Sequence, residues 1–521
     1  MKKFSLVIFL LMISCSVSNE SGIQNTIDEQ KVENKLPPFN GDCIYSLGEA
    51  LDIVYGIVKD NNLQVKITWS ETDMFNRDEK CEGKVVGSNQ AQGAILENDS
   101  SLDLVVAVYK FDDSSDDSSD DSTNISEVQN TFNKTSGINL LFKNKFTFNE
   151  NFNSISDIDK IEIKDKSHYL ITMTYSANII LVDDNFNFID NFLDFSDIVL
   201  SSNTGSESGL INIEIIKKDN SLYTLFISYV DKKSRLTLSQ FELNENLDLL
   251  SNKIIFQGNQ NRKPEHYGGS ILNEENKFLY LSIGDHSIVD KTLANNFTPE
   301  SKILRFSIYQ NNSEISLEPS GINFDPIYNL RNDVNASSLD SIFLSGFRNP
   351  WNFSILNKPN TDEKIYVIGD VGQSKYEEIN IVKEQETLSS LYFGWPFYEG
   401  PFLSPYFNDV SDEVKESHRK PDFYYEHNEN DTGGFRCAII LGGEYSSKYD
   451  YQNGVFLFTD WCSSEIFSLK ITPKGNEFFV YEDVQILNYE SNAINPNLLK
   501  TIGEKTFLLT VNGEVFEFVD K

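Results

Sequence analysis

Positive charge is scarce in this chain. The sequence has 44 Lys and Arg against 79 Asp and Glu, a formal net charge of -35 at pH 7. Such a surface repels polyanions, so the composition excludes nucleic acid as a partner and disfavours anionic lipid headgroups. Long apolar runs are missing as well: beyond the N-terminal segment there is no stretch of about 18 apolar residues, and no membrane-spanning helix is predicted.

The N-terminal segment has the pattern of an export signal. Two lysines follow Met1, and residues 4–13 are almost wholly apolar but too short to span a bilayer. The segment ends Met12-Ile13-Ser14-Cys15, which resembles a bacterial lipobox. Residues 1–15 are therefore predicted to be a lipoprotein signal peptide with Cys15 lipidated. We expect an envelope protein, in the periplasm or on the cell surface, held to the membrane by a lipid alone.

Cysteine is rare, and its count fits an exported protein. Only five cysteines are present, and lipidation of Cys15 would leave an even number in an oxidising compartment. We predict the disulfides Cys43–Cys81 and Cys437–Cys462. The second pair lies on two apolar runs placed symmetrically about residues 449–450, like the arms of a hairpin. The alternative is four buried free thiols.

The region before residue 137 divides into three segments. Residues 16–40 are polar and predict a tether, and residues 111–136, rich in Asp and Ser, predict an extended acidic linker. Between them, residues 41–110 show one amphipathic helical pattern followed by three strand-like runs. The stretches Lys84–Ala94 and Ser100–Val106 resemble a PASTA domain. That resemblance implies a spacer or a module for cell-wall contact.

Helical periodicity is absent from residue 137 onward. Short runs rich in Ile, Leu, Phe, Tyr and Val alternate with Asn, Asp, Ser and Gly, a pattern typical of strands and turns. So many strands exceed the needs of one sandwich, and a propeller avoids free sheet edges by radial repetition. The predicted fold class is mainly β: a β-propeller over residues 137–521, preceded by a small α+β domain.

Five segments, in order, resemble the glucose/sorbosone dehydrogenase family. They are Glu265-His266-Tyr267-Gly268-Gly269 with Gly284-Asp285, Ser301-Lys302-Ile303-Leu304-Arg305, Gly346-Phe347-Arg348-Asn349-Pro350-Trp351, Gly369-Asp370-Val371-Gly372-Gln373, and Phe393-Gly394-Trp395-Pro396. A sixth, Leu441-Gly442-Gly443-Glu444-Tyr445, resembles a later blade of that family. The resemblance implies six blades, pyrroloquinoline quinone (PQQ) and calcium as cofactors, and a sugar or aldehyde as substrate.

The same resemblance assigns roles in an oxidation that removes a proton and a hydride from a sugar hemiacetal. His266 matches the base, Asp285 the residue that orients it, and Glu265 a substrate-contacting carboxylate. Arg348 and Asn349 match the pair that contacts the quinone, where a fixed cation stabilises developing negative charge. Without the resemblance, a lone histidine in a strand-rich domain is more often a structural hydrogen-bonding residue.

A calcium site is also implied. The backbone carbonyls of Gly372 and Gln373 match those that hold the ion against the quinone, and Glu378 stands in the same segment. We expect Glu378 to order that loop.

One departure from the family pattern keeps two other readings open. PQQ carries three carboxylates, which call for Lys or Arg partners. The matching stretch, residues 460–465, has no cation, and only Arg436 and Lys448 are near it in sequence. The motif Gly-Asp-Val-Gly-Gln also resembles a motif of propellers similar to the hedgehog-interacting protein. The alternatives are a noncatalytic propeller that binds carbohydrate or protein, and a calcium-stabilised structural lipoprotein.

Overall fold

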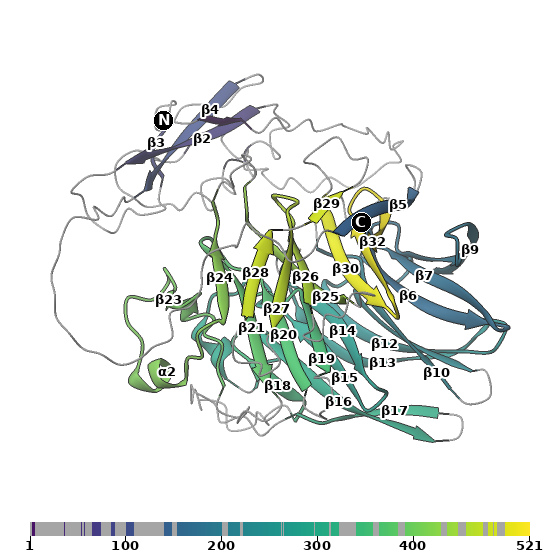
Figure 1. The fold of residues 1–521 in the computed structure, drawn as a ribbon. Helices are drawn as coiled ribbons and strands as arrows, with labels where there is room; N and C mark the ends of the chain where they lie inside the picture. Colours follow the sequence, from purple (N-terminus) through teal and green to yellow (C-terminus); the bar gives the residue numbers. More distant parts are fainter. Residues whose placement is uncertain are drawn as a thin grey trace, which may run out of the picture. The chain divides into compact units, whose positions relative to one another are not determined.

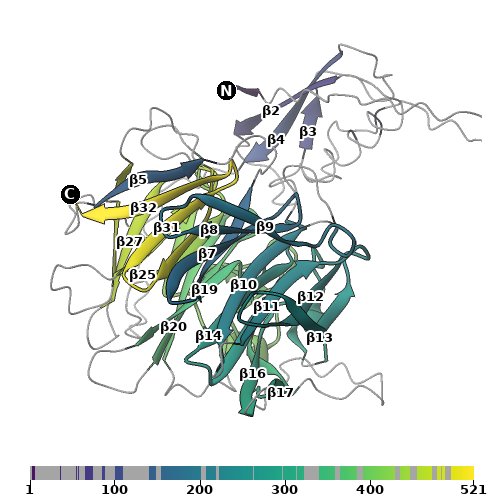
Figure 2. The same ribbon diagram turned by 90° about the vertical axis from the view of Figure 1, so that its right-hand side faces the viewer.

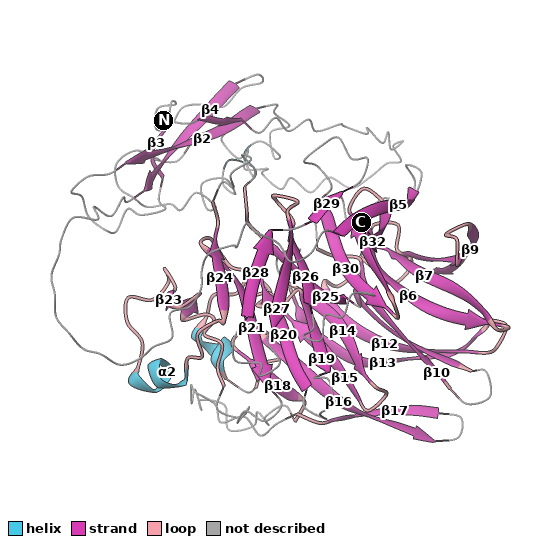
Figure 3. Ribbon diagram, in the orientation of Figure 1, coloured by secondary structure: helices cyan, strands magenta, loops and turns pink. Residues whose placement is uncertain are grey.

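The chain forms two compact units in the computed structural model, Met1–Ile125 and Ser126–Lys521. The structure describes residues 3–5, 36, 54, 57, 65–73, 85–88, 100–108, 140–147, 154–200, 207–218, 222–261, 263, 265–295, 297–311, 314–321, 340–357, 364–383, 391–428, 435–445, 455–471, 478–482, 484–486 and 495–520. Strands dominate both units (Figure 3). No helix within the described ranges is long and apolar enough to cross a membrane.

The first unit contains a small sheet in the order β1-β2-β4-β3. Its strands are β1 (Lys3–Ser5), β2 (Val65–Asp73), β3 (Val85–Ser88) and β4 (Ser100–Val108). β2 and β4 run parallel, and β3 pairs antiparallel with β4. The three predicted strand runs overlap β2, β3 and β4, while β1 falls inside the predicted signal peptide. Cys15, Cys43, Cys81 and the acidic linker lie outside the described residues, and the PASTA resemblance stays a prediction.

The second unit is a six-bladed β-propeller, as the sequence predicts. Blade 1 consists of β6 (Ile155–Ile163), β7 (Lys166–Met173), β8 (Asn178–Asp183) and β9 (Phe188–Asp194). Blade 2 consists of β10 (Leu210–Lys217), β11 (Tyr223–Val230), β12 (Arg235–Leu243) and β13 (Leu249–Gln260). Blade 3 consists of β14 (Gly268–Glu274), β15 (Phe278–Ile283), β16 (Lys302–Asn311) and β17 (Glu314–Pro319), with β18 (Ile342–Ser345) paired to β16.

The remaining blades complete the ring. Blade 4 consists of β19 (Asn352–Asn357), β20 (Lys364–Asp370), β21 (Tyr376–Lys383) and β24 (Phe423–Glu426). Blade 5 consists of β25 (Ile439–Tyr445), β26 (Val455–Asp460), β27 (Ile466–Ile471) and β28 (Phe478–Glu482). Blade 6 joins β30 (Pro496–Ile502), β31 (Lys505–Thr510) and β32 (Glu514–Asp520) to β5 (Leu140–Thr147) and β29 (Val484–Ile486).

The two ends of the propeller domain close the ring in blade 6. β5, the first strand of the domain, pairs antiparallel with β32, the last, and the two lie side by side in both views (Figures 1 and 2). The first strand of every blade contacts the first strand of the next, in the circle β6, β10, β14, β19, β25, β30 and back to β6. This circle surrounds the axis, so the ends of these strands hold the residues that face it.

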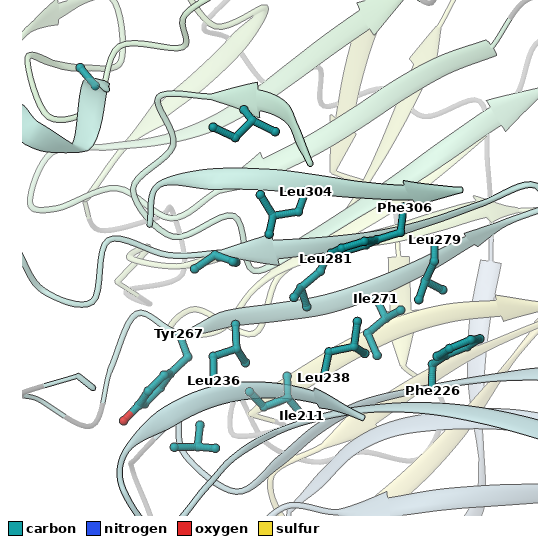
Figure 4. Close-up of a cluster of buried hydrophobic side chains, with 14 of the residues drawn as sticks. Ile211, Phe226, Leu236, Leu238, Tyr267, Ile271, Leu279, Leu281, Leu304 and Phe306 are labelled. Carbon is teal, nitrogen blue, oxygen red and sulfur yellow. The ribbon is translucent and has the colours of Figure 1, made fainter. Parts of the chain in front are cut away.

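Apolar side chains fill the spaces between neighbouring blades. The cluster between blades 2 and 3 includes Leu236 and Leu238 from one blade and Ile271, Leu279 and Leu281 from the other (Figure 4). Strands buried on both faces need apolar residues at successive positions, and all eight residues of β11 are buried. This explains the continuous apolar runs in the sequence where a half-exposed sheet would show strict alternation.

A long excursion separates β21 from β24 in blade 4. It contains the short pair β22 (Tyr398–Glu399) and β23 (Phe402–Leu403), and helix α2 (Asp412–Ser417). The Ser411 hydroxyl caps α2 by accepting a hydrogen bond from the backbone N–H of Val414. A 3-10 helix, η2 (Lys291–Ala294), occupies the loop between β15 and β16. The excursion supplies Trp395 and Glu399 to the site described next.

Candidate active site

The predicted site residues gather at one end of the propeller axis. His266 lies two residues before β14, and Asn349 lies three residues before β19. Asp285 follows β15, and Val371 follows β20 directly. Because the first two strands of a blade are antiparallel, the start of one and the end of the other meet at the same end of the blade. Segments far apart in sequence therefore converge there.

His266 and Asp285 form a hydrogen-bonded pair. The distance from His266 Nδ1 to Asp285 Oδ1 is 2.8 Å, and the Asp285 side chain is completely buried. Asp285 also accepts hydrogen bonds from the backbone N–H of Ser287 (2.7 Å) and from Trp395 Nε1 (3.0 Å). An ionised carboxylate only accepts, so Nδ1 of His266 carries the proton. The carboxylate thereby fixes both the ring orientation and the tautomer.

Arg348 holds the other ring nitrogen of His266. Its Nη2 lies 2.8 Å from His266 Nε2, its Nε donates to Gln373 Oε1 (2.9 Å), and its Nη1 donates to the Val371 carbonyl (2.8 Å). A guanidinium group has no acceptor, so Nε2 must accept the bond, which agrees with the tautomer that Asp285 imposes. The lone pair of Nε2, the only basic site left on the neutral ring, points at Arg348.

Backbone contacts fix the segment around His266. His266 has φ 57°, in the left-handed region that non-glycine residues seldom adopt, and its carbonyl accepts from the backbone N–H of His286 (3.2 Å). Its own N–H donates to Glu207 Oε2 at 2.6 Å. Gly284 must lack a side chain there, because a Cβ would stand 2.2 Å from the His266 carbonyl oxygen. The unusual conformation is thus held by contacts from two other segments.

Glu207 is a site residue that the sequence interpretation missed. It lies three residues before β10, so it occupies in blade 2 nearly the position that His266 occupies in blade 3. Besides His266 it accepts from the backbone N–H of Tyr267 (3.3 Å), and Asn349 Nδ2 lies 3.4 Å away. Burial raises the pKa of Glu207, and the nearby His266 and Arg348 oppose that rise. Comparing the segments before each first strand would have pointed to it.

Asp370 positions the Arg348–Asn349 pair. Its two oxygens accept the backbone N–H of Arg348 (2.8 Å) and of Asn349 (2.7 Å). Burial raises the pKa of Asp370 to about 7, although both hydrogen bonds act in the opposite direction. Asn349 Oδ1 in turn accepts from the backbone N–H of Gly268 (3.1 Å), which ties blade 4 to blade 3. Asp370 belongs to the motif Gly369–Gln373, but the motif alone does not predict this role.

The loop predicted to hold calcium is organised by carboxylates. Glu399 Oε1 accepts the backbone N–H groups of Gln373 (2.8 Å), Ser374 (2.7 Å) and Lys375 (2.8 Å). The N–H of Gly372 lies 3.2 Å from Glu377 Oε1. A Cβ on Gly372 would stand 1.8 Å from the Tyr376 carbonyl, so the tight turn requires glycine.

Glu378 and Glu265 complete the predicted set. Glu378 accepts from the backbone N–H of Gly400 (2.5 Å) and from Asn380 Nδ2 (3.3 Å), contacts that order its surroundings. Burial and the neighbouring Asp370 raise its pKa well above the ordinary value. Glu265 is partly exposed and accepts from the Ser287 hydroxyl at 2.9 Å.

A metal ion would depend on the main chain. No group of three or more His, Cys, Asp or Glu side chains in the described ranges is arranged to hold one. Calcium at the predicted place would therefore rely on the backbone carbonyls of Gly372 and Gln373, since hard cations prefer oxygen ligands.

A cavity of about 270 Å³ adjoins the cluster of site residues around His266 and Arg348. Glu207, Asn349 and Val371 belong to both, whereas His266 and Arg348 are not among its lining residues. Other walls come from the strand ends around the axis and include Tyr175, Ile211, Trp351, Ile440, Trp461 and Asn497. The cavity therefore draws on several blades, as expected for a space at the centre of the ring.

The predicted disulfide Cys437–Cys462 is present and supports one wall of the cavity. The two cysteines flank the antiparallel pair β25 and β26, where Ile439 is paired with Asp460. Their neighbours Ala438 and Trp461 line the cavity. The hairpin interpretation of the sequence is confirmed.

The cavity wall does not fit the three carboxylates of PQQ. Among the described residues that line it, none is Lys or Arg, and one is the acidic Glu207. Arg436, one of the two cations near this region in sequence, makes a two-point contact with Glu465 (2.7 and 2.8 Å). The other, Lys448, lies outside the described residues. Carboxylates placed here would lack charge-assisted partners.

Known proteins share this fold and sequence pattern. The structure of the soluble aldose sugar dehydrogenase from Escherichia coli in its apo form superposes with a TM-score of 0.52 and 13% identity, covering 73% of this chain and 100% of that one. A glucose dehydrogenase superposes with a TM-score of 0.50 and 11% identity, covering 73% of this chain and 99% of its own. At such identities the likeness shows the fold. The family model described as Glucose / Sorbosone dehydrogenase matches residues 160–436, and the chain belongs to that family.

Proposed function

We propose that this protein is a sugar dehydrogenase-like oxidoreductase that oxidises a sugar hemiacetal, with His266 as the proton acceptor. The observation that carries the proposal is the Asp285–His266 pair, which leaves Nε2 as the basic nitrogen of the ring. Membership of the glucose/sorbosone dehydrogenase family supports the sugar as substrate class. The cavity beside the pair provides space for a small ligand.

The oxidation breaks an O–H bond and a C–H bond of the substrate, and the hydride from the C–H bond passes to a two-electron acceptor supplied from outside the chain, such as a quinone. The hydroxyl proton passes to Nε2 of His266, while Asp285 stabilises the imidazolium that forms. In the structure Nε2 accepts a hydrogen bond from Arg348, so the substrate hydroxyl must replace that bond before its proton can move. Arg348, displaced but still tied to Gln373 and Val371, is then placed to stabilise negative charge on the substrate oxygen.

The proposal includes PQQ and calcium as cofactors. The family resemblance supports them, with Arg348, Asn349, Gly372 and Gln373 as the predicted contacts. When bound, the quinone would supply an electrophilic acceptor for the hydride. The cavity wall has no Lys or Arg among its described residues to pair with the carboxylates of PQQ. The proposal therefore depends on the proton transfer to His266, and the binding of PQQ is tested separately by titration.

A second candidate is a noncatalytic propeller that binds carbohydrate or protein. The same observation favours it, namely the lack of cations among the described residues of the cavity wall. Such a protein would need no electron acceptor, and the residues around His266 would serve ligand binding alone.

Export and lipid attachment at Cys15 remain part of the proposal, with residues 16–40 as tether, residues 41–110 as a PASTA-like spacer and residues 111–136 as linker. Radiolabelled fatty acid supplied to cells should label the protein, and Cys15→Ser should abolish that labelling. Labelling that persists in the variant would contradict the lipobox.

The test of the enzyme proposal combines two measurements on the chain without its signal peptide. Aldose sugars should reduce an artificial electron acceptor in the presence of calcium and PQQ, and His266→Ala should lower the rate at least about 100-fold. Calorimetric titration of PQQ should show binding that Arg348→Ala weakens. His168→Ala, which changes a partly exposed histidine of β7, is the matched control and should match the wild type.

If addition of PQQ produces neither detectable heat nor a change in quinone absorbance, PQQ is removed from the proposal. No sugar-dependent reduction with any acceptor would remove the dehydrogenase and favour the noncatalytic propeller.

A further inference from the structure

We infer that the axial cavity, which is lined by Trp351, Trp461, Glu207 and Asn349 among others, selects an uncharged sugar ring and rejects sugars that carry a carboxylate or phosphate. This inference rests on the proposed function for the class of ligand and adds the charge that the ligand must have. The misfit with PQQ and the exclusion of sugar acids have one cause, the charge of the wall.

Two tryptophans give the cavity its aromatic surface. Trp351 lies directly before β19 and Trp461 directly after β26, so they come from blades 4 and 5. Trp461 is 41% exposed, so part of its ring is accessible to a ligand. The C–H face of a sugar ring is apolar and packs on such rings, while its hydroxyls at the edge need polar partners.

Polar partners around the tryptophans are uncharged except for one. Asn349, Asn497, Ser154 and Ser156 line the cavity with amide and hydroxyl groups, which donate and accept hydrogen bonds as sugar hydroxyls require. The exception is Glu207, whose carboxylate accepts hydrogen bonds and, when ionised, repels anions. This set suits a neutral polyhydroxyl compound.

Neither Arg348 nor Arg436 is among the residues that line the cavity. The guanidinium of Arg348 donates to Gln373, Val371 and His266, and that of Arg436 is paired with Glu465 at two points. An anionic group held against the residues that line the cavity would lose its hydration without gaining an ionic partner, which is unfavourable, because Arg348 is reached only at Nε2 of His266. The formal net charge of -35 adds a long-range repulsion at low salt.

The size of the cavity agrees with a single ring. Its volume of about 270 Å³ lies near the lower end of the range for small-molecule sites.

The test is calorimetric binding to the chain without its signal peptide, with PQQ left out. A panel of uncharged aldoses that includes D-glucose is compared with D-glucuronate and glucose 6-phosphate. We expect at least one uncharged sugar to bind, with both anions at least about tenfold weaker at low salt. Glu207→Gln should bring the anions to within about threefold of the neutral sugar, and Trp461→Ala should weaken the neutral sugar about tenfold.

The control for the tryptophan is Tyr309→Ala, an exposed aromatic residue on β16. It should leave all affinities unchanged. Anions that bind as tightly as the neutral sugars, no binding by any uncharged sugar in the panel, or PQQ that displaces the neutral sugar would each overturn the inference. The two proposals fail separately: selective binding without oxidation defeats only the enzyme, and equal oxidation of glucuronate and glucose defeats only the selectivity.

Discussion

The propeller contains two buried charged clusters that use their charges differently. In the first, the site cluster around His266, Asp285 and Arg348, the guanidinium of Arg348 donates to an amide, a carbonyl and a neutral imidazole. In the other cluster, which we call the inter-blade cluster (Lys500, Asp157, Asp159 and Glu214), Lys500 Nζ lies 3.1 Å from Asp157 and 3.5 Å from Glu214. The site cluster comes from loops, whereas the inter-blade cluster comes from β30, β6 and β10, the first strands of blades 6, 1 and 2.

The two clusters differ in role: the inter-blade cluster stabilises the fold, and the site cluster provides groups for the proposed chemistry. Asp157 and Asp159 accept backbone N–H groups of Ile213 (2.8 Å) and Ile215 (2.9 Å), so they link β6 to β10, which belong to different sheets. Lys500 then joins blade 6 to both. The inter-blade cluster thus fastens the ring near its closure. The site cluster offers a histidine and a cation that a substrate can reach by exchanging one hydrogen bond.

Lys500→Met should have the largest effect on stability. The side chain of Lys500 is 18% exposed and that of Asp157 is fully buried, so the substitution leaves a buried carboxylate without its cation. We expect the free energy of unfolding of the propeller to fall by about 3–5 kcal/mol in denaturant titration. Lys217→Met is the matched control, because its pair with Glu162 is half exposed, and it should have no measurable effect. Equal effects of the two variants would show that the inter-blade cluster does not fasten the ring.

Loss of the disulfide should affect the cavity next to the site cluster as well as the stability of the propeller. Cys437 and Cys462 are 25 positions apart, and a loop of this length predicts a loss of about 3 kcal/mol for the double substitution to Ser. Because Ala438 and Trp461 stand beside the cysteines, sugar binding should weaken as well. Thermal unfolding and calorimetry measure the two effects. An unchanged affinity would mean that the disulfide does not shape the cavity.

Asp285→Asn should lower the activity of the site without the loss of stability expected for the inter-blade cluster. An asparagine keeps the shape but can present an N–H to His266 Nδ1, which favours the wrong tautomer. We expect sugar oxidation to drop about 100-fold or more while the denaturation midpoint changes far less than in Lys500→Met. A pH profile that shifts with the substitution supports a role through His266. An unchanged rate would remove Asp285 from the proposed mechanism.

The smallest predicted effect is a pH dependence of the inter-blade cluster. Burial raises the pKa of Glu214 to about 8 and that of Asp159 to about 6, and Lys500 opposes both shifts. Burial also opposes the charge of Lys500, yet Asp157, Glu214 and Asp159 together raise its pKa above the usual value, so it stays charged throughout. A carboxyl group with a raised folded-state pKa binds more protons when folded. Its stabilising contribution is complete below the unfolded pKa and disappears as pH rises through the folded one.

The free energy of unfolding should therefore decline as the pH rises from about 5 to about 8, in part through Glu214. Glu214→Gln should flatten that part of the curve, measured by denaturant titration at several pH values. A wild-type curve that rises over this range would contradict the raised pKa.

Much of the propeller follows from local patterns. The apolar runs Phe278–Ile283 and Lys364–Ile368 have the pattern typical of strands, and they form β15 and part of β20. Runs of apolar residues bounded by turn residues mark strands because each strand needs its own apolar faces, whatever its neighbours are. The pair Cys437 and Cys462 could be matched for the same reason, since a hairpin is a local structure.

The composition of the site was predictable only as far as the family motifs reached. These motifs pointed to His266, Asp285, Arg348 and Gln373, and the structure brings the four together. Glu207 and Glu399 went unrecognised as site residues because their roles consist of contacts to backbone N–H groups 59 and 24 to 26 positions away. No periodicity records which carboxylate meets which amide once the blades are arranged in a ring.

The strand-rich pattern and the cysteine pair were thus readable along the chain, because each depends on residues close in sequence. The bond between Arg348 and His266, the cation-free cavity and the inter-blade cluster came from closing the ring. Lys500 and Asp157 are 343 positions apart, and His266 and Arg348 are 82 apart. Contacts over such distances exist only after the first strands of all blades are packed around one axis.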